Sequence, residues 1–281
     1  MFSFAYDGSI NGDWVSHYAV QLAGAHPDRT LRLVHVRDGG VERARLAEKL
    51  DRLRLECESQ GVRLETRLLE PKSSGRFETL RPALSEGPEH FLICGTPPLD
   101  QRRGGLRGTL AERLLRELYC NVLAVRVVQP GLLGSPRRLL APIDEQPEGF
   151  RSALPFLRLF GPQLTHLHLV LIARVGRGRL HRLSHEHGER LRVPGLAYCA
   201  RVEREIAERL GLGARVMDAQ VLVSDRVDHE ILIAANRTKS RLIYMGVSER
   251  GRAERLRHGD PVEQVLREST CDVAVYRGIG G

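Results

Sequence analysis

The second half of this 281-residue chain repeats the pattern of the first half. Residues 108–126 (GTLAERLLRELYCNVLAVR) and 259–277 (GDPVEQVLRESTCDVAVYR) align without a gap at an offset of 151. Identical residues occupy these aligned positions: Gly108/Gly259, Glu112/Glu263, Leu115/Leu266, Arg116/Arg267, Glu117/Glu268, Cys120/Cys271, Val122/Val273 and Arg126/Arg277. A repeat of this length predicts two similar units of one fold.

The repeat extends upstream with a change of offset. Residues 91–95 align with 242–246 at the same offset of 151, whereas 2–14 align with 139–151 at an offset of 137, which pairs Asp7 with Asp144. The second copy therefore carries about fourteen extra residues. We expect them between its second strand, ending near Ala173, and its third, near Ala214, in a basic segment that contains histidines (174–195).

Strand and helix patterns alternate along the first copy. Apolar runs predict strands at 2–7, 31–36, 62–70, 90–95 and 121–128, and helices are expected at 13–25, 41–60, 76–86 and 110–118. Such alternation indicates βαβ crossovers, hence a five-stranded parallel sheet flanked by helices. The Gly- and Pro-rich segment 129–136 reads as a linker, so we predict domains at 1–129 and 137–281.

Composition narrows the class of protein. No apolar run approaches the ~20 residues of a membrane span, and the N-terminus lacks a signal-peptide pattern, so a cytoplasmic protein is expected. Five scattered cysteines without a CxxC pair favour neither a disulfide framework nor a zinc site. The net charge is +8, and 40 of the 43 basic residues are Arg. Because this charge is not clustered with stacking aromatics, nucleic acid is not the favoured partner.

Candidate ligand-binding residues gather where the predicted parallel strands end. Ligands of open α/β sheets bind beyond the carboxyl ends of the strands. Asp7 follows the first strand, Val36 ends the second, and a Gly- and Arg-rich segment, 95–109, follows the fourth. Its glycines let backbone N–H groups approach an anion, and Thr109 can cap the next helix. A basic surface loop before an ordinary N-cap explains the same residues, and both interpretations stay open.

The spacing in that segment resembles a family signature: Gly, two residues, Gly, nine residues, then Gly and Ser or Thr. Gly95, Gly108 and Thr109 match its first, third and last positions, and Pro98 replaces the second Gly. In the second copy Gly246 and Gly259 match, whereas Glu249 and Asp260 replace the second Gly and the hydroxyl residue. The chain resembles a tandem two-domain universal stress protein. The resemblance rests on this spacing, on the last helix and strand of each copy (within 108–126 and 259–277) and on the segment 227–246.

This resemblance implies two Rossmann-like domains of the adenine nucleotide alpha hydrolase type. It implies that ATP or AMP binds in the first domain, at Asp7, Val36, Gly95, Pro98, Arg107, Gly108 and Thr109. The second site is expected to be degenerate, because carboxylates would face the phosphates; it comprises Asp144, Gly246, Glu249, Gly259 and Asp260. The resemblance also implies an internal pseudo-dimer through strands 121–128 and 272–277, and a homodimer is left open.

No catalytic set or metal site is readable by spacing. His181, His185 and His187 lack a second ligand cluster nearby and are expected in a basic surface loop. We therefore expect a non-enzymatic stress-response protein with a regulatory nucleotide. The alternatives are a scaffold that binds no nucleotide, a slow ATPase and, more weakly, an RNA-associated protein.

Overall fold

The computed structural model describes residues 1–96, 105–144, 147–176, 178, 184–213, 216–247 and 260–279. Its contacts divide the chain into two compact units. Unit 1 comprises Met1–Ser135 with Tyr276–Gly280, and unit 2 comprises Pro136–Val275 with Gly281. The division after Ser135 falls inside the Gly- and Pro-rich segment 129–136.

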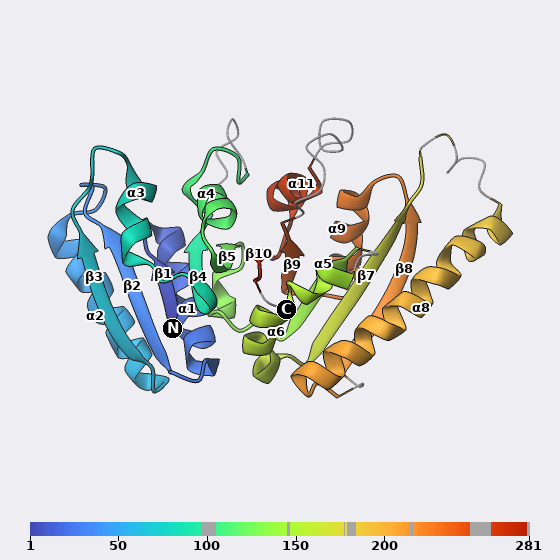
Figure 1. Cartoon of the computed structure of the whole chain (residues 1–281), viewed down its shortest axis with the longest axis horizontal. Coiled ribbons are helices and arrows are strands. Elements are labelled where there is room, and N and C mark those ends of the chain that lie inside the picture. The colour runs from blue at the N-terminus through green and yellow to red at the C-terminus, as the bar shows by residue number, and fades with distance from the viewer. Residues whose placement is uncertain are drawn as a thin grey trace. The chain divides into compact units, whose positions relative to one another are not determined.

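Unit 1 alternates strands and helices (Figure 1). Its elements are β1 (Phe2–Ala5), α1 (Ile10–Ala25), β2 (Thr30–Val36), α2 (Arg43–Ser59), β3 (Arg63–Leu69), α3 (Arg76–Leu80), η1 (Arg81–Ala83), β4 (Gly87–Gly95), α4 (Leu110–Glu117), β5 (Cys120–Arg126) and η2 (Pro130–Leu132).

The five strands of unit 1 form a parallel sheet in the order β3-β2-β1-β4-β5. Phe2 at the start of β1 is in register with Leu31 of β2 and Phe91 of β4. Helix α1 contacts α2, and α3 contacts α4, so a pair of helices covers each face. Both Phe2 and Phe4 are fully buried, which shows that the apolar strand at the start of the chain lies at the centre of the core.

Unit 2 follows the same plan. Its elements are β6 (Arg138–Ile143), α5 (Pro147–Arg151), α6 (Leu154–Phe160), η3 (Gly161–Gln163), β7 (His166–Arg174), α8 (His185–Leu210), β8 (Met217–Ser224), α9 (Val227–Arg237), β9 (Leu242–Gly246), α11 (Pro261–Glu268) and β10 (Asp272–Arg277).

The strand order of unit 2 is β10-β9-β6-β7-β8, the same order along the chain as in unit 1. Leu139 of β6 is in register with Leu167 of β7 and Leu242 of β9, as Phe2 is with Leu31 and Phe91. The predicted α/β fold with parallel strands flanked by helices is therefore confirmed.

Three element boundaries differ from the sequence-based prediction. Helix α1 begins at Ile10 rather than at residue 13, because the Ser9 hydroxyl accepts a hydrogen bond from Gly12 N at 2.9 Å and caps it. The helix expected at 76–86 ends at Leu80 and continues as a 3-10 turn that contains Pro82. The third strand of the second copy begins at Met217, not near Ala214.

The basic segment of the second copy is also partly helical, which corrects the expected loop. Helix α8 begins at His185 and has 26 residues, against 17 in the corresponding α2 of unit 1. The backbones of His185 and His187 thus belong to α8, and His181 lies outside the described residues. Across the described part of the chain, no helix has the length and apolarity required to cross a membrane.

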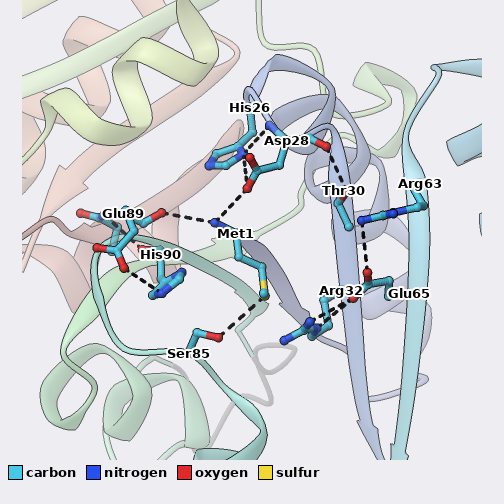
Figure 2. A network of polar contacts seen from close by, with 11 residues as sticks. Met1, His26, Asp28, Thr30, Arg32, Arg63, Glu65, Ser85, Glu89 and His90 are labelled. Atoms are coloured by element: carbon cyan, nitrogen blue, oxygen red, sulfur yellow. Dashed lines mark hydrogen bonds and ion pairs between the residues drawn. The ribbon is translucent and has the colours of Figure 1, made fainter.

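Polar contacts hold the amino ends of the unit 1 strands (Figure 2). The Met1 amino group lies 3.4 Å from Asp28 Oδ2 and donates to the Glu89 carbonyl, which links β1 to the loop after α1 and to β4. On the neighbouring strands, Arg32 of β2 donates through Nε and Nη2 to Glu65 Oε2 of β3, at 3.2 and 3.0 Å. This pair is in register across the strands.

Unit 2 has a titratable pair at the equivalent position. His168 of β7 is in register with Asp218 of β8, and its Nδ1 lies against Asp218 Oδ1. The histidine is buried. Burial lowers the pKa of His168, and the nearby Arg138 and His166 add to this effect while Asp218 opposes it.

We predict that unit 2 loses stability in mild acid through His168. An unfolded histidine titrates near 6.5. Because the folded pKa is lower, the unfolded chain binds the proton more readily, and the contribution of His168 to the unfolding free energy falls as the pH drops below 6.5. Urea unfolding at pH 7.5 and 5.5 measures this. His168→Gln should show a smaller loss between the two than the wild type.

The exposed His229 on α9 supplies a matched control in the same unit. His229→Gln should keep the wild-type difference in unfolding free energy between the two pH values. An equal change in both variants would show that His168 has no special part in the pH dependence.

Candidate functional site

The carboxyl ends of three adjacent strands of unit 1 meet at one edge of its sheet. Strand β1 lies between β2 and β4, with Ala5 in register with Val34 and with Cys94. Two residues further along, Asp7 therefore stands between Val36 and the Gly95–Thr96 step. The structure thus brings together three of the site residues predicted from sequence, at the point where strand order reverses.

Asp7 is fixed by the turn that begins α1. Its Oδ1 accepts hydrogen bonds from Ser9 N at 3.0 Å and from the Ser9 hydroxyl at 2.8 Å. The same hydroxyl accepts from Gly12 N, so Ser9 joins the carboxylate to the first turn of the helix. The Asp7 side chain is nevertheless exposed, which leaves it accessible to a ligand.

A glycine in the first turn of the helix makes room for this carboxylate. A Cβ atom on Gly12 would lie only 2.4 Å from Asp7 Oδ1. In unit 2 a Cβ atom on Gly149 would lie 2.4 Å from Asp144 Oδ1. The two Asp–Gly pairs aligned in the sequence therefore make the same close contact in both units.

A charged network of Lys49, Asp13 and Tyr6 contacts the turn before α1. Lys49 of α2 donates to the Gly8 carbonyl at 2.8 Å and forms an ion pair with Asp13, which also accepts a hydrogen bond from the Tyr6 hydroxyl. Burial and the Asp13 carboxylate raise the pKa of Tyr6, so the phenol remains a donor. Sequence analysis missed this network. Its one sequence signal is that Lys49 is one of only three lysines in the chain.

Helix α1 also contacts the end of β4. Asn11 Nδ2 donates to the Thr96 carbonyl at 2.8 Å, and a Cβ atom on Gly95 would lie 2.8 Å from the same nitrogen. Gly95 therefore allows the helix to approach the strand, in addition to any role toward a ligand. The Thr96 hydroxyl is buried and has no hydrogen-bond partner among the described residues. Neither Asn11 nor Thr96 was predicted as a site residue.

The end of β2 supplies an apolar surface with charge beyond it. Val36 is buried, and the neighbouring His35 bonds through Nδ1 to the Tyr6 carbonyl at 2.9 Å. Asp38 accepts from Gly40 N at 3.0 Å and pairs with Arg76 of α3. Burial alone would raise the pKa of Asp38, but the Gly40 N–H and Arg76 lower it, so the carboxylate is ionised.

The start of α4 is capped by its own side chains. Gly108 adopts a left-handed φ of +71°, and its N–H donates to Glu112 Oε2 at 2.7 Å. The Thr109 hydroxyl accepts from Glu112 N at 3.1 Å and donates to the Leu106 carbonyl. The predicted N-cap at Thr109 is confirmed. Arg107 is exposed beside it, whereas Pro98 lies outside the described residues.

The corresponding edge of unit 2 has different chemistry. The carboxylate of Asp260 caps α11 by accepting from Val262 N at 3.1 Å, in the place that Thr109 holds in unit 1. Asp144 is exposed beyond β6, and Gly246 ends β9. Burial, followed by the charge of Asp144, raises the pKa of Tyr198 of α8 to about 12. Glu249 and Gly259 lie outside the described residues.

A Gly→Ala substitution inside a helix usually increases stability, but the Asp7–Gly12 contact predicts the opposite at position 12. Gly12→Ala should destabilise the chain by about 1–3 kcal/mol, because the new methyl group overlaps Asp7 Oδ1 and presses on the buried Tyr6 ring. Gly24→Ala is the control in the same helix, where a Cβ atom meets Val62 Cγ2 at 3.6 Å. That variant should be neutral or stabilised by up to about 1 kcal/mol. Urea unfolding compares the two, and equal effects would contradict the close contact.

Solved structures share the fold over nearly the whole chain. A universal stress protein from Archaeoglobus fulgidus DSM 4304 matches with 16% identity and a TM-score of 0.61, covering 99% of this chain and 96% of that one. A functionally unknown protein from Pseudomonas aeruginosa PAO1 matches with 16% identity and a TM-score of 0.56, over 98% and 91%. The cytoplasmic domain of a prokaryotic cation chloride cotransporter matches with 11% identity and a TM-score of 0.58, over 99% and 95%.

Likeness at these identities shows the fold alone, and proteins of different roles share it. No curated protein sequence matches the chain. A family model gives a more specific result: the model of the universal stress protein family matches residues 136–277, which is half of the chain and nearly all of unit 2. The chain therefore belongs to the universal stress protein family.

Proposed function

We propose that this protein is a non-enzymatic stress-response protein that binds one adenine nucleotide, ATP or AMP, in unit 1 as a regulatory ligand. The observation that carries the proposal is the difference between the two helix starts that follow β4 and β9. A neutral Thr109 caps α4, whereas the carboxylate of Asp260 caps α11. Phosphates are attracted to a helix N-terminus, and a carboxylate already there opposes them.

Other contacts of unit 1 support the same site. Asp7 is exposed between the ends of β2 and β4, and the apolar Val36 ends β2 beside it. In the described part of the chain the Thr96 hydroxyl has no hydrogen-bond partner. Family resemblance supports the assignment of adenine to the Asp7 and Val36 side and of phosphates to the Gly108–Thr109 side. Among the described residues of this site, no pair of side chains is suited to activating a water molecule, which favours binding over hydrolysis.

The alternative is a scaffold that binds no nucleotide. One observation favours it: the Gly108 N–H, a donor that a phosphate would use, already bonds to the Glu112 carboxylate. A nucleotide would have to replace or share that contact. The experiment below separates the two functions.

We expect unit 1 to bind the nucleotide more tightly than unit 2. Two unit charges ~4 Å apart at an effective dielectric of 20 interact by about 4 kcal/mol, and a quarter of that weakens binding roughly five-fold. Thr109→Asp should therefore weaken ATP binding at least five-fold. Asp also caps helices well, so the start of α4 stays intact. Asp260→Thr, the reciprocal change, should leave the affinity unchanged or raise it.

Calorimetric titration of the purified chain with ATP and with AMP measures both affinity and stoichiometry. We expect one nucleotide per chain in the wild type. Full affinity in Thr109→Asp would contradict the assignment to unit 1. The absence of binding by the wild type to either nucleotide would overturn the nucleotide proposal and support the scaffold.

A second pair of variants tests the strand end rather than the helix start. Asp7→Asn should weaken nucleotide binding, because it removes the exposed carboxylate at the proposed adenine side while preserving the size of the side chain. Asp144→Asn is the matched change in unit 2 and should have no effect. Calorimetry under the same conditions compares them, and equal losses in both would argue against a site confined to unit 1.

A further inference from the structure

A buried hydroxyl group lies at the carboxyl edge of the unit 1 sheet. Thr96 follows β4 directly and is only 4% exposed. Within the ranges that the structure describes, its hydroxyl meets no hydrogen-bond partner. Removing a hydroxyl from water without giving it a partner costs stability, so most buried hydroxyls in proteins are hydrogen-bonded. Exceptions in native proteins are expected at functional sites.

The backbone of Thr96 is held on both sides, which fixes the face on which its side chain lies. Its N–H donates to the Val125 carbonyl of β5 at 2.9 Å, and its carbonyl accepts from Asn11 Nδ2 at 2.8 Å. The preceding Gly95 faces α1, because a Cβ atom there would meet Asn11 and Val15. Successive residues of a strand point to opposite faces, so the Thr96 side chain lies on the face that α3 and α4 cover.

This position lies between the two ends of the proposed nucleotide site. Strand β4 stands between β1, which leads to Asp7, and β5, and adjacent strands lie about 5 Å apart (Figure 1). Helix α4, which begins after Thr109 at the proposed phosphate side, packs on β5. In a nucleotide the ribose joins the base to the phosphates. A nucleotide with its base beside Asp7 and its phosphates at Thr109 therefore brings its ribose to Thr96.

Unit 2 has a residue of the same shape at this position, without the hydroxyl. At the offset of 151 that aligns the two copies, Gly95 and Thr96 correspond to Gly246 and Val247. Threonine and valine are both β-branched, and valine carries a methyl group in place of the hydroxyl. Packing at the end of the strand is thus satisfied by valine in unit 2. The hydroxyl belongs to the unit to which we assign the nucleotide.

We propose that the Thr96 hydroxyl forms a hydrogen bond with a ribose hydroxyl, which makes unit 1 selective for ribonucleotides over deoxyribonucleotides. This contact belongs to the proposed nucleotide site and rests on that proposed function. A threonine hydroxyl both donates and accepts, which suits a ribose hydroxyl because that group also does both. A site that hydrogen-bonds a hydroxyl of its ligand discriminates against an analogue that lacks it.

Calorimetric titration of the full chain with ATP, 2′-deoxyATP and 3′-deoxyATP tests this contact. The wild type should bind at least one deoxy analogue about five- to tenfold more weakly than ATP, as expected for one lost hydrogen bond. Thr96→Val should bind ATP more weakly by a similar factor and should no longer distinguish that analogue from ATP. Thr96→Ser keeps the hydroxyl and should keep the preference. Val247→Thr, the reverse change in unit 2, should leave all three affinities unchanged.

Urea unfolding of the chain without nucleotide separates a ligand contact from a structural role. If the hydroxyl bonded within the protein, Thr96→Val would lower the midpoint of unfolding. A buried hydroxyl that serves only a ligand predicts an unchanged or higher midpoint, because valine removes a polar group from the interior. Thr96→Val should therefore weaken nucleotide binding without weakening the fold, and a lower midpoint would contradict the proposed role.

The outcomes distinguish this contact from the site to which it belongs. Wild-type ATP affinity in Thr96→Val would overturn the contact and leave the proposed nucleotide site standing. A Thr96→Val variant that binds weakly but keeps the full preference for ATP over the deoxy analogues would overturn the assignment to the ribose. A wild type that binds no nucleotide would overturn the proposed function and the ribose contact with it.

Discussion

The close approach of a helix to the end of a strand is the constraint on which the rest of each unit depends. In unit 1 the Asp7 carboxylate lies against the α-carbon of Gly12, and in unit 2 Asp144 lies against Gly149. A Cβ atom at either glycine would overlap the aspartate carboxylate, which would have to move. With the turn in place, Ser9 can cap α1, and Asn11 can reach the backbone beyond β4. The absence of a side chain at this glycine thus leaves room for the carboxylate beside the first turn of the helix.

The two units keep this contact and differ in the charges placed around it. An arginine and a glutamate, Arg32 and Glu65, form a salt bridge between β2 and β3, whereas a histidine and an aspartate face each other across β7 and β8. A neutral hydroxyl caps α4, whereas a carboxylate caps α11. Each replacement preserves the local structural role, since both pairs bridge strands and both residues cap helices. The two units therefore share one fold while the electrostatics around their equivalent positions differ.

Periodic patterns were sufficient to predict the strands, the parallel sheet and the position of Asp7, Val36 and Gly95 at its edge. These features depend on apolar spacing and on chain order, which are visible in one sequence. The supporting residues were missed because their roles arise from contacts between distant segments. Lys49 lies 41 residues from the Gly8 carbonyl that it bonds, and Asn11 lies 85 residues from Thr96. The N-cap at Ser9 was a local signal, but Asn11 and Gly12 in the first turn obscured it.

The carboxylate cap of α11 affects how the occupancy of the protein depends on nucleotide concentration. Two equivalent sites in one chain can cooperate, and the Hill coefficient can then rise toward the number of sites. In this chain the Asp260 carboxylate occupies the N-terminus of α11. We therefore propose that only one site, in unit 1, can bind a nucleotide. If unit 1 binds a nucleotide as proposed, the occupancy of a single chain follows a simple hyperbola in ligand concentration. Such a protein reports a nucleotide level in a graded manner over a wide range, rather than switching at a threshold.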